Sequence, residues 1–358
     1  MPLHRPLDRS PSFTALLLVP VAVAATAAWP ARAQAARAGE AQICSLGFAD
    51  VGQTGTVICK STVTGATTQA IPVGAPVSAA GAIGGSLASG DGQVLVTNQV
   101  GGALIFREAD GHLTSPQVLD TAGEGSLSGA VSRRGAYVLT GTHVRFFRHG
   151  ETVASSSQPL LLGDGSAAEV TLGDRYAYVS EKNGSLEAFL LGRDGNLVGD
   201  ARPVTGISAG VIVGISGYEG GVIAPIAHLA SNPDQAEIAV AEGTSRIQTV
   251  PTKEVAACWT ANDDEEACVS NPGSMTVSCG RLGRDGFETY TSAAASPGES
   301  VFDLDLRAGL VGIQAVHAGA PVLLTYARTS GDFLTLVSEV PIGTAKAAGA
   351  LLLPPVSR

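Results

Sequence analysis

The chain has 358 residues, a formal net charge of −10 and a charged fraction of only 15%. An acidic chain without basic clusters argues against nucleic acid and against anionic lipid surfaces as partners. Its 45 glycines and its long runs of Val, Leu, Thr and Ser, with only two methionines, favour an all-β body over a helical one.

The first 33 residues are typical of a secretory signal peptide. Two arginines precede an apolar run at residues 13–29, and an Ala-Arg-Ala triplet of the kind that signal peptidases cleave ends at residue 33. An uncleaved membrane anchor is the alternative, but so short a run lies at the lower limit for spanning a bilayer. We therefore expect residues 34–358 to form a single secreted or periplasmic domain, without membrane contact once residues 1–33 are removed.

One β unit recurs along the rest of the chain. Its clearest copy is residues 176–197, where two apolar strands flank an Asn-Gly pair at 183–184 and an Asp-Gly pair follows. Both pairs supply the positive φ that two-residue hairpin turns require, so we expect tight hairpins here. Similar phrases stand at 94–113 and 266–287.

Seven such units can be aligned on their first clear strand. Their starts are separated by 39 to 51 residues and lie near Ile43, Val94, Tyr137, Tyr176, Val222, Glu266 and Ile313. A period of about 45 residues with turn-rich β content is typical of the four-stranded blades of a β-propeller. The sequence therefore predicts an all-β fold, a seven-bladed β-propeller with four-stranded antiparallel blades.

A short inner strand is expected ahead of five of these starts, at residues 127–131, 168–172, 211–215, 257–261 and 301–306. Inner strands line the central channel of a propeller, so Glu169 and Asp305 are expected to face a shared channel. A ring must also join its ends. Either the flank of Ile43 or the last apolar segment, residues 345–353, is expected to complete the final blade.

Five cysteines follow the leader, in a chain that an export signal would send to an oxidising compartment. Folding each hairpin back on its turn places Cys44 opposite Cys59 and Cys268 opposite Cys279. Facing positions of this kind meet disulfide distances when they form a non-hydrogen-bonded pair. We predict these two disulfides and one free thiol, Cys258, with five reduced thiols as the alternative.

Three phrases carry a resemblance to a known family. They are the triplet Ala257-Cys258-Trp259, the stretch at 268–278 followed by an Asp-Gly turn, and the repeat at 178–197. Together they resemble the lactonase-type propellers, which include bacterial 6-phosphogluconolactonase, fungal 3-carboxymuconate cyclase and many secreted relatives. The resemblance covers roughly residues 43–343. Its motifs are structural repeats, so it implies the fold and leaves the chemistry to individual residues.

Opening or closing a lactone needs a base and a cation or donor that stabilises the developing oxyanion. The residues that could supply a base are Glu169, Glu181, His228 and His317, and those that could supply a cation are Lys182 and Arg281. We take Glu169, Glu181, Lys182 and His228 as the candidate catalytic residues. Glu169 has the best position, on an expected inner strand. A solvated turn pair is the alternative for Glu181 and Lys182, and a packed or surface residue is the alternative for His228.

Other chemistries have weaker support. Carboxylates around the channel could hold Ca²⁺, but no zinc-ligand spacing or nucleotide-binding motif is present, so we expect neither a cofactor nor a resident metal. A cysteine nucleophile needs a neighbouring base such as histidine, and the sequence indicates none beside Cys258.

Two functions remain open. The first is a hydrolase or cyclase acting on a small lactone or sugar acid at the channel mouth. The second is a non-catalytic extracytoplasmic binding or scaffold propeller, with a carbohydrate or cell-envelope component as the first ligand to try. Because a propeller closes on itself, we expect a monomer.

Overall fold

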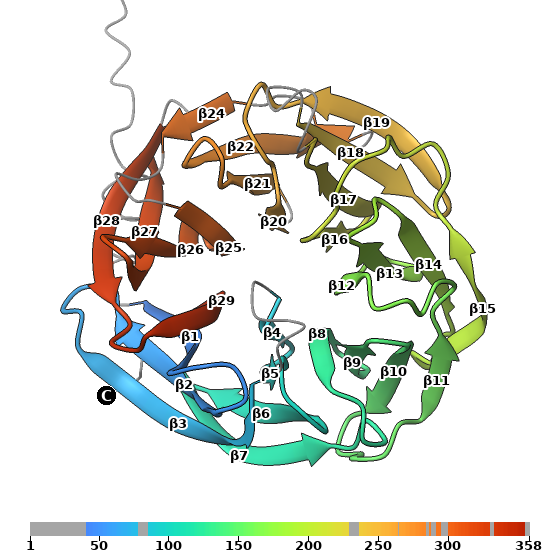
Figure 1. Ribbon diagram of the computed structural model, residues 1–358, viewed down its shortest axis with the longest axis horizontal. Helices are drawn as coiled ribbons and strands as arrows, with labels where there is room; N and C mark the ends of the chain where they lie inside the picture. Colours follow the sequence, from blue (N-terminus) through green and yellow to red (C-terminus); the bar gives the residue numbers. More distant parts are fainter. Residues whose placement is uncertain are drawn as a thin grey trace, which may run out of the picture.

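A computed structural model describes residues 41–77, 85–228, 236–263, 265–283, 286–287, 291–294, 300–329 and 333–354. Within these ranges the regular elements are 29 strands, which form seven sheets around a central axis (Figure 1). Six sheets have four strands and one has five. The predicted seven-bladed β-propeller is thus confirmed. The predicted signal peptide, residues 1–33, lies outside the described residues.

The first four blades, each given from the axis outward, combine the following strands. Blade 1 contains β29 (Lys346–Leu353), β1 (Gln42–Phe48), β2 (Thr54–Ser61) and β3 (Thr67–Pro76). Blade 2 contains β4 (Leu87–Gly90), β5 (Gln93–Val96), β6 (Ala103–Ala109) and β7 (His112–Leu119). Blade 3 contains β8 (Ser126–Ser132), β9 (Gly135–Thr140), β10 (His143–Arg148) and β11 (Ser156–Pro159). Blade 4 contains β12 (Ala167–Leu172), β13 (Tyr176–Glu181), β14 (Leu186–Leu191) and β15 (Leu197–Pro203).

The last three blades follow the same order. Blade 5 contains β16 (Ser216–Tyr218), β17 (Gly221–Ile226), β18 (Glu237–Glu242) and β19 (Ser245–Pro251). Blade 6 contains β20 (Trp259–Asn262), β21 (Glu266–Asn271) and β22 (Thr276–Gly283), against which both β23 (Gly286–Phe287) and β24 (Thr291–Ala294) pair. Blade 7 contains β25 (Ser300–Arg307), β26 (Leu310–His317), β27 (Ala320–Thr329) and β28 (Phe333–Pro341).

The second strand of each blade is where the sequence was easiest to interpret. Each of the seven predicted unit starts lies on such a strand, from Ile43 on β1 to Ile313 on β26. Strands β9, β17 and β21 are buried along their whole length, because each face packs against a neighbouring blade. A strand covered on both sides is a continuous apolar run rather than an alternating one, and such runs are easily recognised.

The core is divided among the interfaces between blades. Seven hydrophobic clusters occur among the described residues, and each joins one pair of neighbouring blades. The cluster between blades 3 and 4, for example, contains Tyr137 and Phe146 facing Val170 and Phe189. Apolar burial between blades therefore continues around the whole ring, and each blade is stabilised from both sides.

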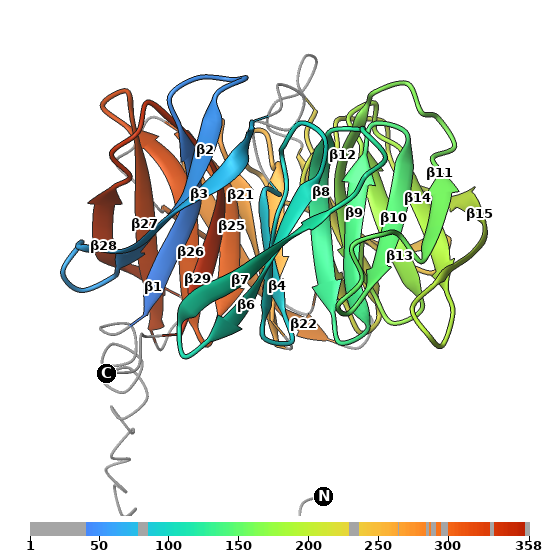
Figure 2. The ribbon, with the colours of Figure 1, turned by 90° about the horizontal axis from the view of Figure 1, so that it is seen from below.

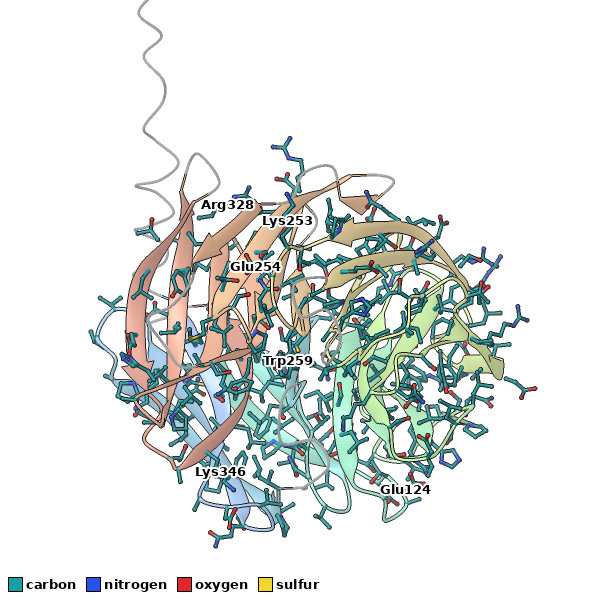
Figure 3. The ribbon with its side chains drawn as sticks, turned by 45° about the horizontal axis from the view of Figure 1, so that its top comes forward. Glu124, Lys253, Glu254, Trp259, Arg328 and Lys346 are labelled. Carbon is teal, nitrogen blue, oxygen red and sulfur yellow. A yellow bond between two sulfur atoms is a disulfide. The ribbon has the colours of Figure 1, made fainter. Side chains whose placement is uncertain are left out.

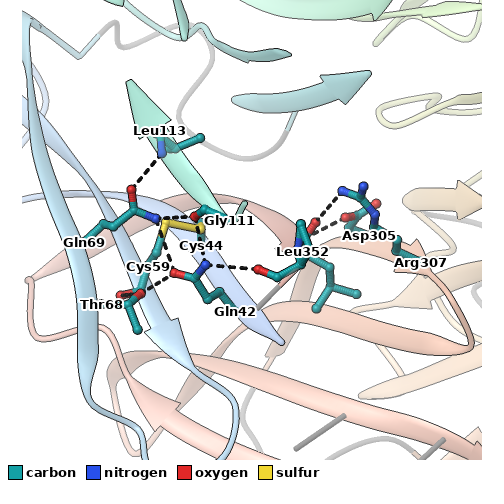
Figure 4. The surroundings of a disulfide bond; sticks show 11 residues. Gln42, Cys44, Cys59, Thr68, Gln69, Gly111, Leu113, Asp305, Arg307 and Leu352 are labelled. Atoms are coloured by element: carbon teal, nitrogen blue, oxygen red, sulfur yellow. Dashed lines mark hydrogen bonds between the residues drawn. A yellow bond between two sulfur atoms is a disulfide. The ribbon is translucent and has the colours of Figure 1, made fainter. Parts of the chain in front are cut away.

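The ring is closed by the last strand of the chain. β29 pairs with β1 and becomes the innermost strand of blade 1, so the apolar segment at 345–353 is the closing strand. Gln42 Nε2, at the start of β1, donates to the carbonyl oxygens of Gly111 (2.9 Å) and Pro354 (3.1 Å), and so links the end of β29 to blade 2. Figure 4 shows this network beside the Cys44–Cys59 disulfide.

Both predicted disulfides are confirmed. Cys44 faces Cys59 in the β1–β2 ladder and Cys268 faces Cys279 in the β21–β22 ladder, with Cα–Cα distances of 4.0 and 4.1 Å. These short distances are those of non-hydrogen-bonded pairs. Cys258 is the free cysteine.

Three local expectations were wrong: two turns and one inner strand. The turn at Asp194-Gly195 has three residues, since Gly195 N donates to Gly192 O (3.0 Å) and Gly195 has a φ of 92°. The turn after β13 is not a two-residue turn: Gly184 N donates to Glu181 O (2.9 Å), and Gly184 alone has positive φ, at 92°. This is a three-residue loop with a terminal left-handed glycine.

The inner strand expected at 211–215 starts instead at Ser216. Val211 forms only an isolated bridge with Ala227, and Gly214 N donates to Cys258 O of the next blade. The backbone of this segment is therefore committed to bonds outside the blade 5 ladder.

Candidate functional site

The two faces of the ring can be told apart by the direction of the inner strands. Inner strands begin at the upper face, drawn at the top of Figure 2, and end at the lower face. Because the second strands are antiparallel to them, Glu181 and Lys182 lie at the upper face, whereas Arg307 and Leu353 lie at the lower face.

Four inner strands contain one extra residue near their upper ends. The ladder register shifts between Ser126 and Ser128, Ala167 and Glu169, Val301 and Leu304, and Ala348 and Leu351. A bulge of this kind bends the strand and redirects side chains, and bulges are common beside functional sites.

Next to these bulges lies a group that we call the axial cluster, formed by Gly85, Ser128, Glu169 and Asp303. Gly85 N donates to Asp303 Oδ2 (3.0 Å), and a Cβ added to Gly85 would lie 3.2 Å from Glu169 Oε1 and 2.9 Å from Ser128 Oγ. Ile215 N donates to Glu169 Oε2 (2.9 Å). Main-chain N–H groups from two separate segments, at Gly85 and Ile215, therefore bind the two carboxyl groups.

Burial shifts the protonation of both carboxyl groups. It raises the pKa of Glu169 well above its ordinary value, and the nearby charge of Asp303 adds to this effect against the Ile215 N–H bond. Burial likewise raises the pKa of Asp303 to about 7, although it accepts N–H bonds from Gly85, Leu304 and Ala350. Burial and the neighbouring charge therefore both favour the protonated form of these carboxyl groups.

The raised pKa values of Glu169 and Asp303 predict that the propeller is more stable at acidic pH. The folded state binds more protons than the unfolded chain, so stability is fully present below the unfolded pKa near 4 and is lost as pH rises through about 7. Denaturant unfolding should therefore give a larger free energy at pH 5 than at pH 8. Glu169→Gln keeps an acceptor for Ile215 N–H without the charge, and should be more stable than the wild type at pH 8 by about 1–2 kcal/mol. Exposed Glu219→Gln is the control, and the same pH slope in all three proteins would contradict the prediction.

Glu181 lies apart from the axial cluster, at the upper end of blade 4. It is 0% exposed, Ser166 Oγ donates to its Oε2 (2.6 Å), and burial raises its pKa to about 7 with help from Glu187. Glu187 in turn accepts the N–H groups of Leu161 (3.0 Å) and Leu162 (3.3 Å). The predicted Glu181 is thus a buried group that holds the loop between blades 3 and 4. It does not line the lower mouth or the other cavities of the described residues.

The remaining predicted residues are not gathered into one site. Lys182 N donates to Ser166 O (2.8 Å) in the turn after Glu181. His228 follows β17 on blade 5, next to Gly210, and His317 contacts Glu339 on blade 7. Burial raises the pKa of the Cys258 thiol to about 12, so it is not a thiolate nucleophile.

A polar cavity of about 300 Å³ opens at the lower end of the channel and is lined by residues of blades 1, 2, 6 and 7. Asp305 and Arg307 line it from β25, two residues apart and hence on one face of the strand, together with Asp91, Glu108 and Asn262. Burial raises the pKa of Asp305, opposed by the Leu352 N–H bond and by Arg307. We call this cavity the lower mouth. It brings a carboxyl group with a raised pKa and a guanidinium to one wall.

The lower mouth adjoins a wider cavity of about 1180 Å³, which shares Asn262 and is lined by the carboxylates of Asp174, Glu219, Glu242 and Asp263. Among the described residues, no three His, Cys, Asp or Glu side chains are arranged to hold a metal ion. The calcium alternative therefore has no ligand set in this part of the chain.

Asp303 and Arg307 are the residues that the sequence did not single out. Asp303 lies two positions before Asp305, which a regular strand would place on the same face, but the bulge between Val301 and Leu304 obscures this spacing. Arg307 is the last residue of β25. The i, i+2 spacing of Asp303, Asp305 and Arg307 was the available signal.

The fold and the channel define the class of protein, a seven-bladed β-propeller with a polar axis. No model of a protein family matches the chain, and no curated protein sequence matches it. None of the described residues forms a helix with the length and hydropathy needed to span a bilayer.

Solved structures do resemble it. The periplasmic gluconolactonase PpgL of Pseudomonas aeruginosa is 12% identical, with a TM-score of 0.60 over 88% of this chain and 99% of its own. A 6-phosphogluconolactonase candidate from Bacteroides uniformis is 14% identical, with the same TM-score over 88% and 100%. A protein from Lactobacillus plantarum is 16% identical, with a TM-score of 0.60 over 88% and 99%. The resemblance to lactonase-like propellers is therefore confirmed at the level of the fold.

Proposed function

We propose that the protein is an extracytoplasmic lactonase-like hydrolase that opens a small lactone at the lower mouth. The observation that carries this proposal is the placement of Asp305 and Arg307 on one wall of a polar cavity of about 300 Å³. An extracytoplasmic location is supported by the two disulfides and by the signal-like first 33 residues.

The chemistry follows from these two side chains. The Asp305 carboxylate takes a proton from a water molecule, whose oxygen attacks the lactone carbonyl, and a raised pKa makes it a stronger base. The Arg307 guanidinium stabilises the oxyanion that forms. The ring C–O bond then breaks, the leaving oxygen takes the proton back from Asp305, and the product is a hydroxy acid that ionises at neutral pH.

Proton release offers a direct test. The mature protein, in weak buffer at pH 7, should acidify solutions of at least one lactone from a panel of glucono-1,5-lactone, its 6-phosphate, a homoserine lactone and dihydrocoumarin. Asp305→Asn keeps an acceptor for Leu352 N–H but loses the base, and should reduce turnover by about 100-fold or more. Asp174→Asn, in the adjoining cavity, is the matched control and should keep full turnover.

One observation favours a structural role for Asp305 and Arg307, and hence the second function, a non-catalytic binding or scaffold propeller. Leu352 N donates to Asp305 Oδ2 (2.7 Å) and Arg307 Nη1 donates to Leu352 O (3.2 Å), so both side chains hold the closing strand (Figure 4). A well-folded protein that turns over no lactone, or an Asp305→Asn variant with unchanged turnover, would favour this second function over hydrolysis.

A further inference from the structure

A third cavity, of about 310 Å³, lies at the opposite end of the molecule from the lower mouth. It opens between blades 7 and 1, where β29 begins and where β1 and β26 end. Most of its wall is carbon, supplied by Phe48, Val51, Phe302, Val316, Pro321 and Ala347. We call it the upper cavity.

Packing behind the upper cavity holds its aromatic walls in place. Phe48 is 2% exposed and belongs to the core between blades 1 and 2. Phe302 meets the edge of Trp259 with ring centroids 5.7 Å apart and an interplanar angle of 76°. Figure 3 shows Trp259 close to the axis and Lys346 farther out on blade 1. The cavity is thus preformed, as small-molecule sites usually are.

One buried polar group faces this apolar space. Gln314 lines the cavity and is only 3% exposed. Its amide nitrogen donates a long bond to Ala315 O (3.4 Å), and its amide oxygen accepts no hydrogen bond from the residues that the structure describes. A molecule that supplies an N–H or O–H to this oxygen would gain a hydrogen bond inside an otherwise apolar cavity.

The charges at the rim cancel. Lys346 Nζ lies 2.6 Å from Asp50 Oδ1, and this bond lowers the pKa of Asp50, which keeps the carboxylate ionised beside the ammonium group. The wall therefore offers an unpaired charge neither to an anion nor to a cation. An uncharged molecule suits it best.

We propose that the upper cavity binds an uncharged, ring-sized apolar molecule that donates one hydrogen bond to Gln314. A cavity of about 150 Å³ is enough for benzene, so the volume here accommodates a fused two-ring system such as an indole or a naphthol. The site is separate from the lower mouth, and its ligand is not a substrate of the proposed hydrolysis.

Indole and 1-methylindole form a matched pair of probes, because only indole has an N–H. Titration calorimetry with the full mature protein should show indole binding about fivefold more tightly, which is the effect of one neutral hydrogen bond. Gln314→Leu should remove this difference by weakening indole alone. Val316→Phe should fill the cavity and abolish binding of both, whereas Val118→Phe, at a 61% exposed position on β7, should change neither.

Three results would overturn the proposal: no binding of indole, equal affinity for the two probes, or binding that survives Val316→Phe. Melting temperatures establish that each variant is folded, and if Gln314→Leu is not, the comparison of the two probes on the wild type still decides. Lactone turnover is scored separately, so failure at one end of the molecule leaves the other test intact.

Discussion

A chain that ends after Thr344, and so lacks β29, is expected to lose the cooperative unfolding transition of the propeller. Blade 1 would lack its innermost strand, and Leu351 and Leu352 would be missing from the cores that blade 1 shares with blades 2 and 7. The bond from Ser45 Oγ to Ala348 O (3.0 Å) would also be lost. Losses on this scale are comparable with the whole stability of a domain, about 5–15 kcal/mol. Near-ultraviolet circular dichroism during heating measures the effect.

Truncation after Pro354 is the control, because it leaves β29 complete and should preserve the transition. Adding a synthetic peptide of residues 345–354 to the shortened protein should restore part of the transition by refilling the empty position beside β1. A shortened protein that melts as sharply and at the same temperature as the full chain would show that the ring does not depend on its last strand.

Gly217→Ala is expected to destabilise the protein strongly at the interface of blades 4 and 5. A Cβ at position 217 would lie 1.8 Å from the carbonyl oxygen of Leu172 and 2.3 Å from its carbonyl carbon. These are backbone atoms of the neighbouring inner strand, which cannot rotate away as a side chain can. Forcing them apart should cost about 2–4 kcal/mol in the free energy of unfolding, measured by denaturant titration.

Gly141→Ala is the matched control. Gly141 has no atom within 4 Å of an added Cβ and no positive φ, so the same methyl group meets open space there. This variant should be neutral or slightly stabilised, because alanine restricts the unfolded chain. Equal losses in the two variants would mean that the close approach of blades 4 and 5 is not what position 217 requires.

The fold could be predicted from the sequence because its signals are local. Each second strand contains a group of apolar residues bounded by turns, and the interval between these groups gives the number of blades. The disulfides were predictable for the same reason, since Cys44 and Cys59 are only 15 residues apart and face each other across one hairpin. Short inner strands carry less information, and the strand at 211–215 was misplaced because Val211 forms only an isolated bridge with Ala227 and Gly214 N donates to Cys258 O of the next blade.

The candidate site could not be predicted in the same way because its contacts join distant blades. Gly85 and Asp303 are 218 residues apart, and Glu169 and Ile215 are 46 apart. Glu169 was correctly placed on an inner strand, but its nearest charged neighbour is Asp303 rather than Asp305. Glu181 and Lys182 follow each other in sequence, yet the carboxyl group of Glu181 turns inward to Ser166.

The strand order of blade 1 also determines when this blade can be completed during folding. Ser45 and Ala348 are 303 residues apart, so one edge of β1 stays unpaired until β29, about 300 residues later, is available. Joining such distant partners is entropically costly and comes late. We therefore expect blade 1 to remain incomplete until late in folding, when β29 pairs with β1 and closes the ring.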